Sequence, residues 1–137
     1  MWKYYALLSA LFAALTAILA KVGVKGINGN LATAIRTTIV LFLAWGIVFF
    51  SGYLKGVREL SKANWIFLIL SGLATGLSWI FYFKALETGD VSKVTPIDKL
   101  SIVFVMILAF VFLHEPMDIK TVAGGLLIVA GTVVLLM

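Results

Sequence analysis

Five apolar stretches without a charged residue divide the chain. They contain 14 to 21 residues each and cover residues 4–20, 37–54, 63–83, 100–113 and 121–137. A helix needs about 20 mostly apolar residues to cross the hydrocarbon core of a bilayer, and several stretches extend past a single bounding charge. The pattern therefore predicts five transmembrane helices, at approximately residues 4–24, 31–51, 64–84, 93–113 and 119–137.

The apolar stretches read as helices and not as strands of a barrel. Transmembrane strands alternate apolar and polar residues, whereas residues 104–112 (FVMILAFVF) are apolar on both faces. The first stretch, with Lys3 before it and small residues at its end, also resembles a signal peptide, but it is longer than the usual ~7 to 15 apolar residues. We expect an all-α integral membrane protein with one five-helix domain over residues 1–137, and Asp118 as N-cap of the fifth helix.

Composition excludes a water-soluble globular domain. The chain is 63% hydrophobic and 12% charged, against about 45–50% and about 25% in soluble proteins. A net charge of +5 would indicate nucleic acid as a partner of a soluble protein, but these charges lie in short segments between apolar stretches. They are better explained as membrane flanks, so we expect lipid and not nucleic acid as the surrounding partner.

Few residues are available for catalysis or metal binding. The chain has no Cys, one His and six scattered carboxylates, which leaves no nucleophile with a visible base and no set of metal ligands. We therefore expect no enzyme activity, no metal and no cofactor.

Two charged residues interrupt the predicted helices. If the second helix starts near Leu31 and the fourth near Ser92, Arg36 and Asp98 each lie five or six residues inside, about 8 to 9 Å below the same membrane surface. Lone charges at such depth are costly, and an Arg and a carboxylate can satisfy each other. An Arg36–Asp98 pair in the bundle interior is the first specific prediction.

Several residues near these charges are further candidates for substrate binding or gating. Lys99 follows Asp98 directly, and Pro96 precedes both. In the first turn of a helix the missing amide of Pro96 is harmless, whereas deeper placement would leave carbonyls of the preceding turn for a polar ligand. Trp79 and Tyr82, one turn apart, provide either the aromatic wall of a cavity or an interfacial belt. Lys21, Lys84 and Glu87 at span ends read as ordinary flanks.

Small residues suggest where helices pack. Gly72 and Gly76 form a GxxxG motif in the third helix, and Gly124 and Gly131 lie one heptad apart in the fifth. Small residues let helices approach closely in lipid. The motif fits packing within one chain and contact with another subunit equally well.

The segment from Phe81 resembles the EamA domain of the drug/metabolite transporter superfamily. The resembling features are an aromatic-Lys-Ala-Leu end to the third helix, Pro96 early in the fourth, a Glu after it and a Gly-rich fifth helix. The stretch TPIDKLS, residues 95–101, is similar to the short single-domain prokaryotic branch. One departure is His114 before Glu115, where the family often has Gly.

This resemblance implies half of a ten-helix inverted-repeat transporter. Five spans place the termini on opposite sides of the membrane, so a second copy would supply the other repeat. Excluding the embedded Arg36 and Lys99, five Lys and Arg residues flank the N-terminal side and four the other. With so little asymmetry, we expect insertion in both orientations and an antiparallel homodimer.

The function implied is secondary transport of a small metabolite or drug-like solute across a prokaryotic inner membrane. No GxxxxGK[ST] motif occurs, so ATP is not expected to drive it directly. The alternative is a non-transporting membrane assembly or scaffold subunit, whose small-residue faces serve only helix packing.

Overall fold

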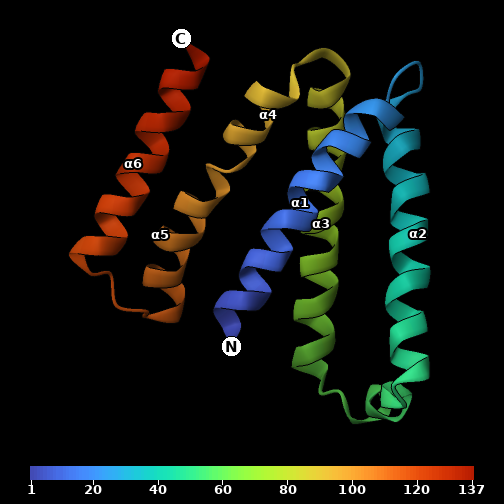
Figure 1. The fold of residues 1–137 in the computed structure, drawn as a ribbon. Helices are drawn as coiled ribbons and strands as arrows, with labels where there is room; N and C mark the ends of the chain where they lie inside the picture. Colours follow the sequence, from blue (N-terminus) through green and yellow to red (C-terminus); the bar gives the residue numbers. More distant parts are fainter. The chain divides into compact units, whose positions relative to one another are not determined.

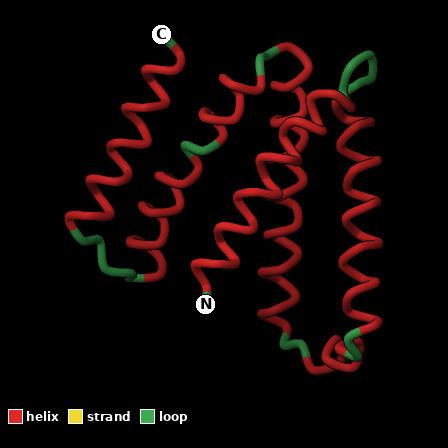
Figure 2. Tube along the Cα trace, in the orientation of Figure 1, coloured by secondary structure: helices red, strands yellow, loops and turns green.

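The computed structural model describes residues 1–137 and consists of helices joined by short loops (Figures 1 and 2). In chain order, the elements are α1 (Trp2–Gly23), α2 (Gly29–Phe50), the 3-10 helix η1 (Tyr53–Glu59), α3 (Lys62–Thr88), α4 (Val91–Asp98), α5 (Ser101–Leu113) and α6 (Ile119–Leu136). Five segments are long and apolar enough to cross a membrane, with α4 and α5 together forming one of them. The all-helical, five-span prediction is confirmed.

The fourth span is not the single helix expected over residues 93–113. Helix α4 starts at Val91, so Pro96 lies in its second turn and not in its first. Pro96 has no amide hydrogen for the Ser92 carbonyl, and its ring pushes that turn apart. Beyond Pro96 the backbone hydrogen bonds become those of a 3-10 helix. The amides of Leu100, Ile102 and Val103 donate to carbonyls three residues earlier. The span is therefore interrupted at Lys99 and Leu100.

The third span is longer than expected and continues to Thr88 instead of ending near residue 84. Its last turns carry Ala, Leu and Glu, which favour helix, and Leu86 is fully buried there. Its end is held by Lys21, whose Nζ donates to the Leu86 carbonyl at 2.6 Å.

The chain divides into two compact units, residues 19–88 and residues 1–18 with 89–137. In the first unit α2 packs along α3. Residues from both helices are buried, Ala32 and Thr33 on α2 and Phe83 and Leu86 on α3. This helical hairpin positions Arg36 of α2 opposite the aromatic residues of α3.

In the second unit α6 packs against both α4 and α5. Gly125 of α6 is buried, and a Cβ there would lie 3.4 Å from the Met106 sulfur of α5. The turn between α5 and α6 contains His114 at φ 54°, the only non-glycine residue with positive φ. The Glu115 amide donates back to the Ala109 carbonyl at 3.3 Å, so the chain folds back on the last turns of α5, with His114 in the left-handed conformation that glycine usually adopts after a helix.

Asp118 caps α6, as predicted. Its carboxylate accepts from the Thr121 amide at 2.8 Å and from the Thr121 hydroxyl at 2.5 Å. These hydrogen bonds, the side-chain one first, hold the pKa of Asp118 below its usual value. The cap satisfies amides of the first turn, which have no partner within the helix.

Candidate functional site

Arg36 lies against the aromatic side chains of α3. Its guanidinium carbon is 4.6 Å from the ring centroid of Trp79 and 5.4 Å from that of Phe83. Trp79 and Phe83 are four residues apart on α3 and therefore share one face. Both distances are within the ~6 Å at which a cation is attracted to a ring face. The hairpin thus brings two of the predicted site residues, Arg36 and Trp79, into contact.

Phe83 is a site residue that the sequence analysis did not identify. It is 3% exposed, and its ring also packs edge-on against Tyr82 at 6.2 Å between centroids. The sequence signal for Phe83 was its spacing of four residues from Trp79, which places the two rings on the same face of a helix. Tyr82, predicted together with Trp79, reaches this cluster through its contact with Phe83.

No carboxylate of its own unit pairs with Arg36. Residues 19–88 contain two carboxylates, Glu59 and Glu87. Glu59 ends the 3-10 helix after α2, and the Glu87 carboxylate accepts a hydrogen bond from the Gly29 amide. Arg36 therefore lies over the two rings, while the unit provides no ion pair for its N–H groups.

Glu87 and Lys21 have structural partners beyond the flanking role expected of them. Glu87 joins the end of α3 to the first turn of α2 at Gly29, and Lys21 joins α1 to α3 through the Leu86 carbonyl. A Cβ on Gly29 would lie 2.8 Å from Glu87 Oε1 and 3.2 Å from the Phe83 carbonyl carbon. The absence of a side chain at Gly29 therefore permits this approach.

Asp98 and Lys99 form an ion pair at the interruption of the fourth span. Asp98 Oδ2 and Lys99 Nζ are 3.6 Å apart, and both side chains are partly exposed. They follow Pro96, whose carbonyl would bond the Leu100 amide in a regular helix. That amide donates to Ile97 instead, and the Thr132 hydroxyl of α6 lies 3.4 Å from the Pro96 oxygen.

The predicted Arg36–Asp98 pair joins residues of the two units. Each of these residues lies seven positions after the first residue of its helix, Gly29 of α2 and Val91 of α4, or about 10 Å along the axis. The structure describes each unit separately, so the pair stays a prediction. Trp79 and Tyr82 belong to the unit of Arg36, and Pro96 and Lys99 to that of Asp98.

The four predicted packing glycines have open space around them. A Cβ on Gly72, Gly76, Gly124 or Gly131 would meet no atom within 4 Å. The glycines in close contact are Gly29 and Gly125, which lie outside the GxxxG motif and the heptad pair. Contact of the four open glycines with another copy remains a prediction.

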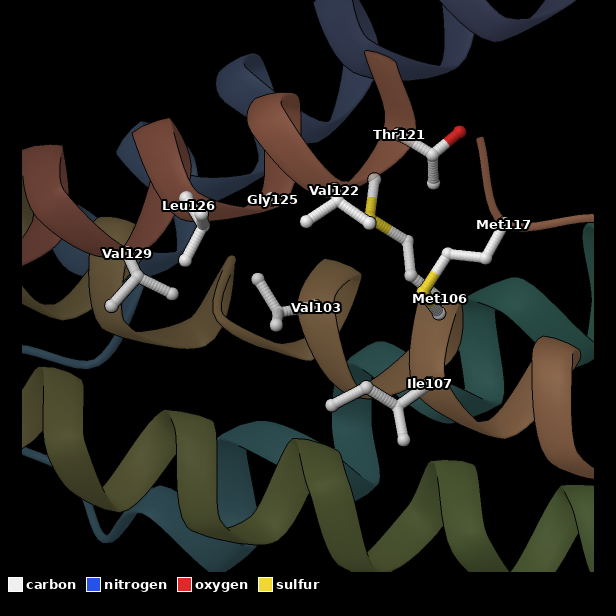
Figure 3. Close-up of a pocket in the computed structure, with 9 residues that line it drawn as sticks. All are labelled: Val103, Met106, Ile107, Met117, Thr121, Val122, Gly125, Leu126 and Val129. Carbon is white, nitrogen blue, oxygen red and sulfur yellow. The ribbon is translucent and has the colours of Figure 1, made fainter. Parts of the chain in front are cut away.

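An apolar pocket of about 140 Å³ lies between α5 and α6 (Figure 3). It is lined by Val103, Met106, Ile107, Met117, Thr121, Val122, Gly125, Leu126 and Val129. The lining contains none of the predicted site residues and no charged group. This pocket therefore belongs to the packing of the second unit and is not a polar binding site.

Comparison with known proteins identifies the family. The model of the EamA-like transporter family matches residues 1–137. The chain is 48% identical over 134 residues to a Sinorhizobium sp protein named "Uncharacterized transporter in cobO 3'region", covering 98% of this chain and 95% of that protein. It is 33% identical over 64 residues to the Bacillus subtilis "Uncharacterized transporter YvbV", covering 47% of this chain and 21% of that protein.

No solved structure matches the chain. The family match covers every span described above, from α1 to α6. The chain therefore belongs to the EamA-like transporter family and is a multi-pass membrane transporter.

Proposed function

We propose that the chain is a secondary transporter that moves a small metabolite or drug-like solute by alternating access, and that two copies of opposite orientation form the working unit. The observation that carries the proposal is the odd number of spans. An odd number places the two termini on opposite sides of the membrane. Transporters of inverted repeats rock one repeat against another around a central site, and one copy supplies a single repeat.

The lengths of the relatives support a half-transporter. The Sinorhizobium relative aligns over nearly the whole of both chains, so it has the same single-domain size. In YvbV the 64 aligned residues are only 21% of the protein, which makes that protein more than twice as long as this chain. Both relatives are bacterial, which supports a place in the cytoplasmic membrane of a prokaryote.

The intramembrane charges support a wet interior between copies. Charged groups within spans usually face a bundle interior or a water-filled cavity, and interrupted backbone at membrane depth is tolerated only where protein or water covers it. Arg36 lies within the second span, and the Asp98–Lys99 pair lies at the interruption of the fourth. We assign these residues, with Trp79, Tyr82 and Pro96, to the solute pathway.

The open glycines support contacts between copies. Gly72 and Gly76 on α3 and Gly124 and Gly131 on α6 leave small-residue faces with no atom against them. In lipid such faces favour close helix contact. We assign them to the interface of the antiparallel dimer.

The orientation of the copies is tested by labelling single cysteines. The chain has no Cys, so Ser61→Cys before α3 and Ile27→Cys in the loop before α2, both exposed and uncharged positions, each introduce one thiol, on opposite sides of the membrane and without changing the loop charge. In sealed vesicles treated with an impermeant maleimide, each variant should be labelled in about half of its copies from either side. Strictly one-sided labelling of both variants would contradict the antiparallel dimer.

Transport is tested separately, with the purified chain in liposomes and a library of metabolites. Solutes that raise the melting temperature of the native protein should also cross the membrane faster in proteoliposomes than in protein-free liposomes. A dimer that no solute stabilises and that moves none would instead indicate a non-transporting assembly subunit.

A further inference from the structure

We propose that Arg36 binds an oxyanion of the transported solute, a carboxylate or a phosphate. This inference rests on the proposed function and names its substrate class. It starts from the contacts of Arg36 with Trp79 and Phe83.

The aromatic contacts hold the charge of Arg36 without offering an oxygen to its hydrogen-bond donors. The guanidinium carbon lies over the rings of Trp79 and Phe83, 4.6 Å and 5.4 Å from their centroids. The N–H donors of arginine form a fork that matches two oxygens of a carboxylate or phosphate. The two rings therefore keep the guanidinium in place and leave its strongest interaction for an oxyanion.

The oxyanion must come from outside the α2–α3 hairpin. Glu87 is already bonded to the Gly29 amide, and Glu59 lies in η1, which follows the far end of α2 from Gly29. An arginine within a span needs a negative partner, because a lone charge in the hydrocarbon core is costly. A solute anion supplies that partner while the solute is bound.

The carboxylate at the interruption of the fourth span has a cation of its own. Lys99 Nζ is 3.6 Å from Asp98 Oδ2. Asp98 therefore has a partner within its own unit.

In the antiparallel dimer, the two-fold axis would place one Arg36 toward each surface of the membrane. Each side would then meet an equivalent arginine. The proposal therefore predicts selectivity for anions from both sides of the membrane.

The test measures melting temperatures of the purified full chain in lipid-free detergent with four anionic probes, namely benzoate, phenyl phosphate, succinate and inorganic phosphate. Benzamide and succinamide are the neutral analogues, and tetraphenylphosphonium is the cationic probe. At least one anion should stabilise the protein in a concentration-dependent way, and the neutral analogues should not.

Substitutions connect the response to Arg36. Arg36→Gln should weaken the apparent Kd of the stabilising anion by about tenfold or more, and Arg36→Lys, which keeps the charge but loses the fork, should lie between. Lys25→Gln, an exposed change of the same charge in a loop, is the matched control and should bind like the native chain. If Arg36→Gln does not fold, a chain with Trp2, Trp45 and Trp65 changed to Phe reports binding through Trp79 fluorescence.

The outcomes separate this inference from the proposed function. Absence of a response to all four anions, or an equal response in Arg36→Gln, would overturn the anion site. A response to tetraphenylphosphonium alone would overturn the anionic class and leave a transporter. A response only to added phosphatidic acid, and to no soluble probe, would show a lipid headgroup site instead of a solute site. One-sided cysteine labelling would overturn the antiparallel dimer and would not affect the anion site.

Discussion

At the scale of single residues, two positions show how backbone conformation and side-chain size act in this fold. His114 has the left-handed conformation that L residues rarely adopt, with φ 54°. Gly29 lies where any side chain would meet Glu87 and the backbone of Phe83. Glycine would adopt the conformation of residue 114 at lower cost than histidine, and at residue 29 only glycine avoids the contact with Glu87 and Phe83.

Changing His114 to Gly should stabilise the protein. The left-handed conformation costs a residue with a Cβ roughly 1 to 2 kcal/mol, and glycine gives back about 0.5 to 1 kcal/mol through the entropy of the unfolded chain. We expect His114→Gly to raise the free energy of unfolding by up to about 1 kcal/mol, measured as a higher melting temperature in detergent. The opposite change, Gly52→Ala at φ 74°, should lower the melting temperature. If His114→Gly were destabilised instead, the imidazole of His114 would have to make a stabilising contact.

Changing Gly29 to Ala should destabilise the α2–α3 hairpin. The Glu87 carboxylate can move away from a new Cβ, but the backbone of Phe83, 3.2 Å from it, must shift with its helix. Such overpacking costs roughly 1 to 3 kcal/mol. Gly46→Ala on the same helix meets no atom within 4 Å and is the control, so equal melting temperatures for the two variants would contradict this reading of the contact.

At the scale of elements, the interruption of the fourth span is the main departure from expectation. The apolar pattern predicts one helix because it reports how long a segment lies in lipid, and α4 with α5 has the length of one span. The pattern does not report the hydrogen-bond ladder. Pro96 in the second turn, and the Thr132 hydroxyl beside the Pro96 carbonyl, show where the ladder is replaced.

Replacing Thr132 by Val should weaken the contact between α4 and α6. The Thr132 hydroxyl is buried and lies 3.4 Å from the Pro96 carbonyl and 2.9 Å from that of Ile128. Val has nearly the same shape, so the loss is mainly the one O–H donor, which these two carbonyls share and which is worth up to about 0.6 kcal/mol as a hydrogen bond between helices. We expect a lower melting temperature for Thr132→Val.

The control for this prediction is Thr75→Val. The Thr75 hydroxyl is exposed and bonds only within its own helix, to the Ser71 carbonyl. Thr75→Val should therefore leave the melting temperature nearly unchanged. The same small shift in both variants would mean that the Thr132–Pro96 contact adds nothing.

At the scale of the whole molecule, the charges that flank the spans are nearly balanced between the two sides. Short loops with more Lys and Arg stay in the cytoplasm. Five flanking cations on one side and four on the other provide little bias. Small changes in loop charge should therefore decide the orientation of this chain.

Chains fixed in one orientation should be inactive alone and active together. Ser51→Lys with Leu54→Lys adds two cations to one side, and Ile27→Lys with Asn30→Lys adds two to the other, all at exposed positions. Each double variant should insert one way and lose solute flux, because it lacks an inverted partner. Co-expression should restore the flux, measured in vesicles; a double variant that transports alone at the native rate would contradict the antiparallel dimer.

Much of the architecture was predictable from the order of residues along the chain. Five apolar stretches of membrane-spanning length predicted five spans. Asp118 was recognisable as a cap because its partners are three residues away. The presence of Arg36 and Asp98 within spans also marked them as candidates, since their cost depends on depth alone.

Contacts between distant residues followed from packing and were not predictable in the same way. Phe83 beside Arg36, Glu87 on the Gly29 amide and Thr132 beside the Pro96 carbonyl each join different helices. Bilayer thickness sets the length of every span, so the length and polarity of a span can be recognised from consecutive residues of the sequence. Which faces meet depends on how side chains of several helices fit at once, and that fit exists only when the helices have packed.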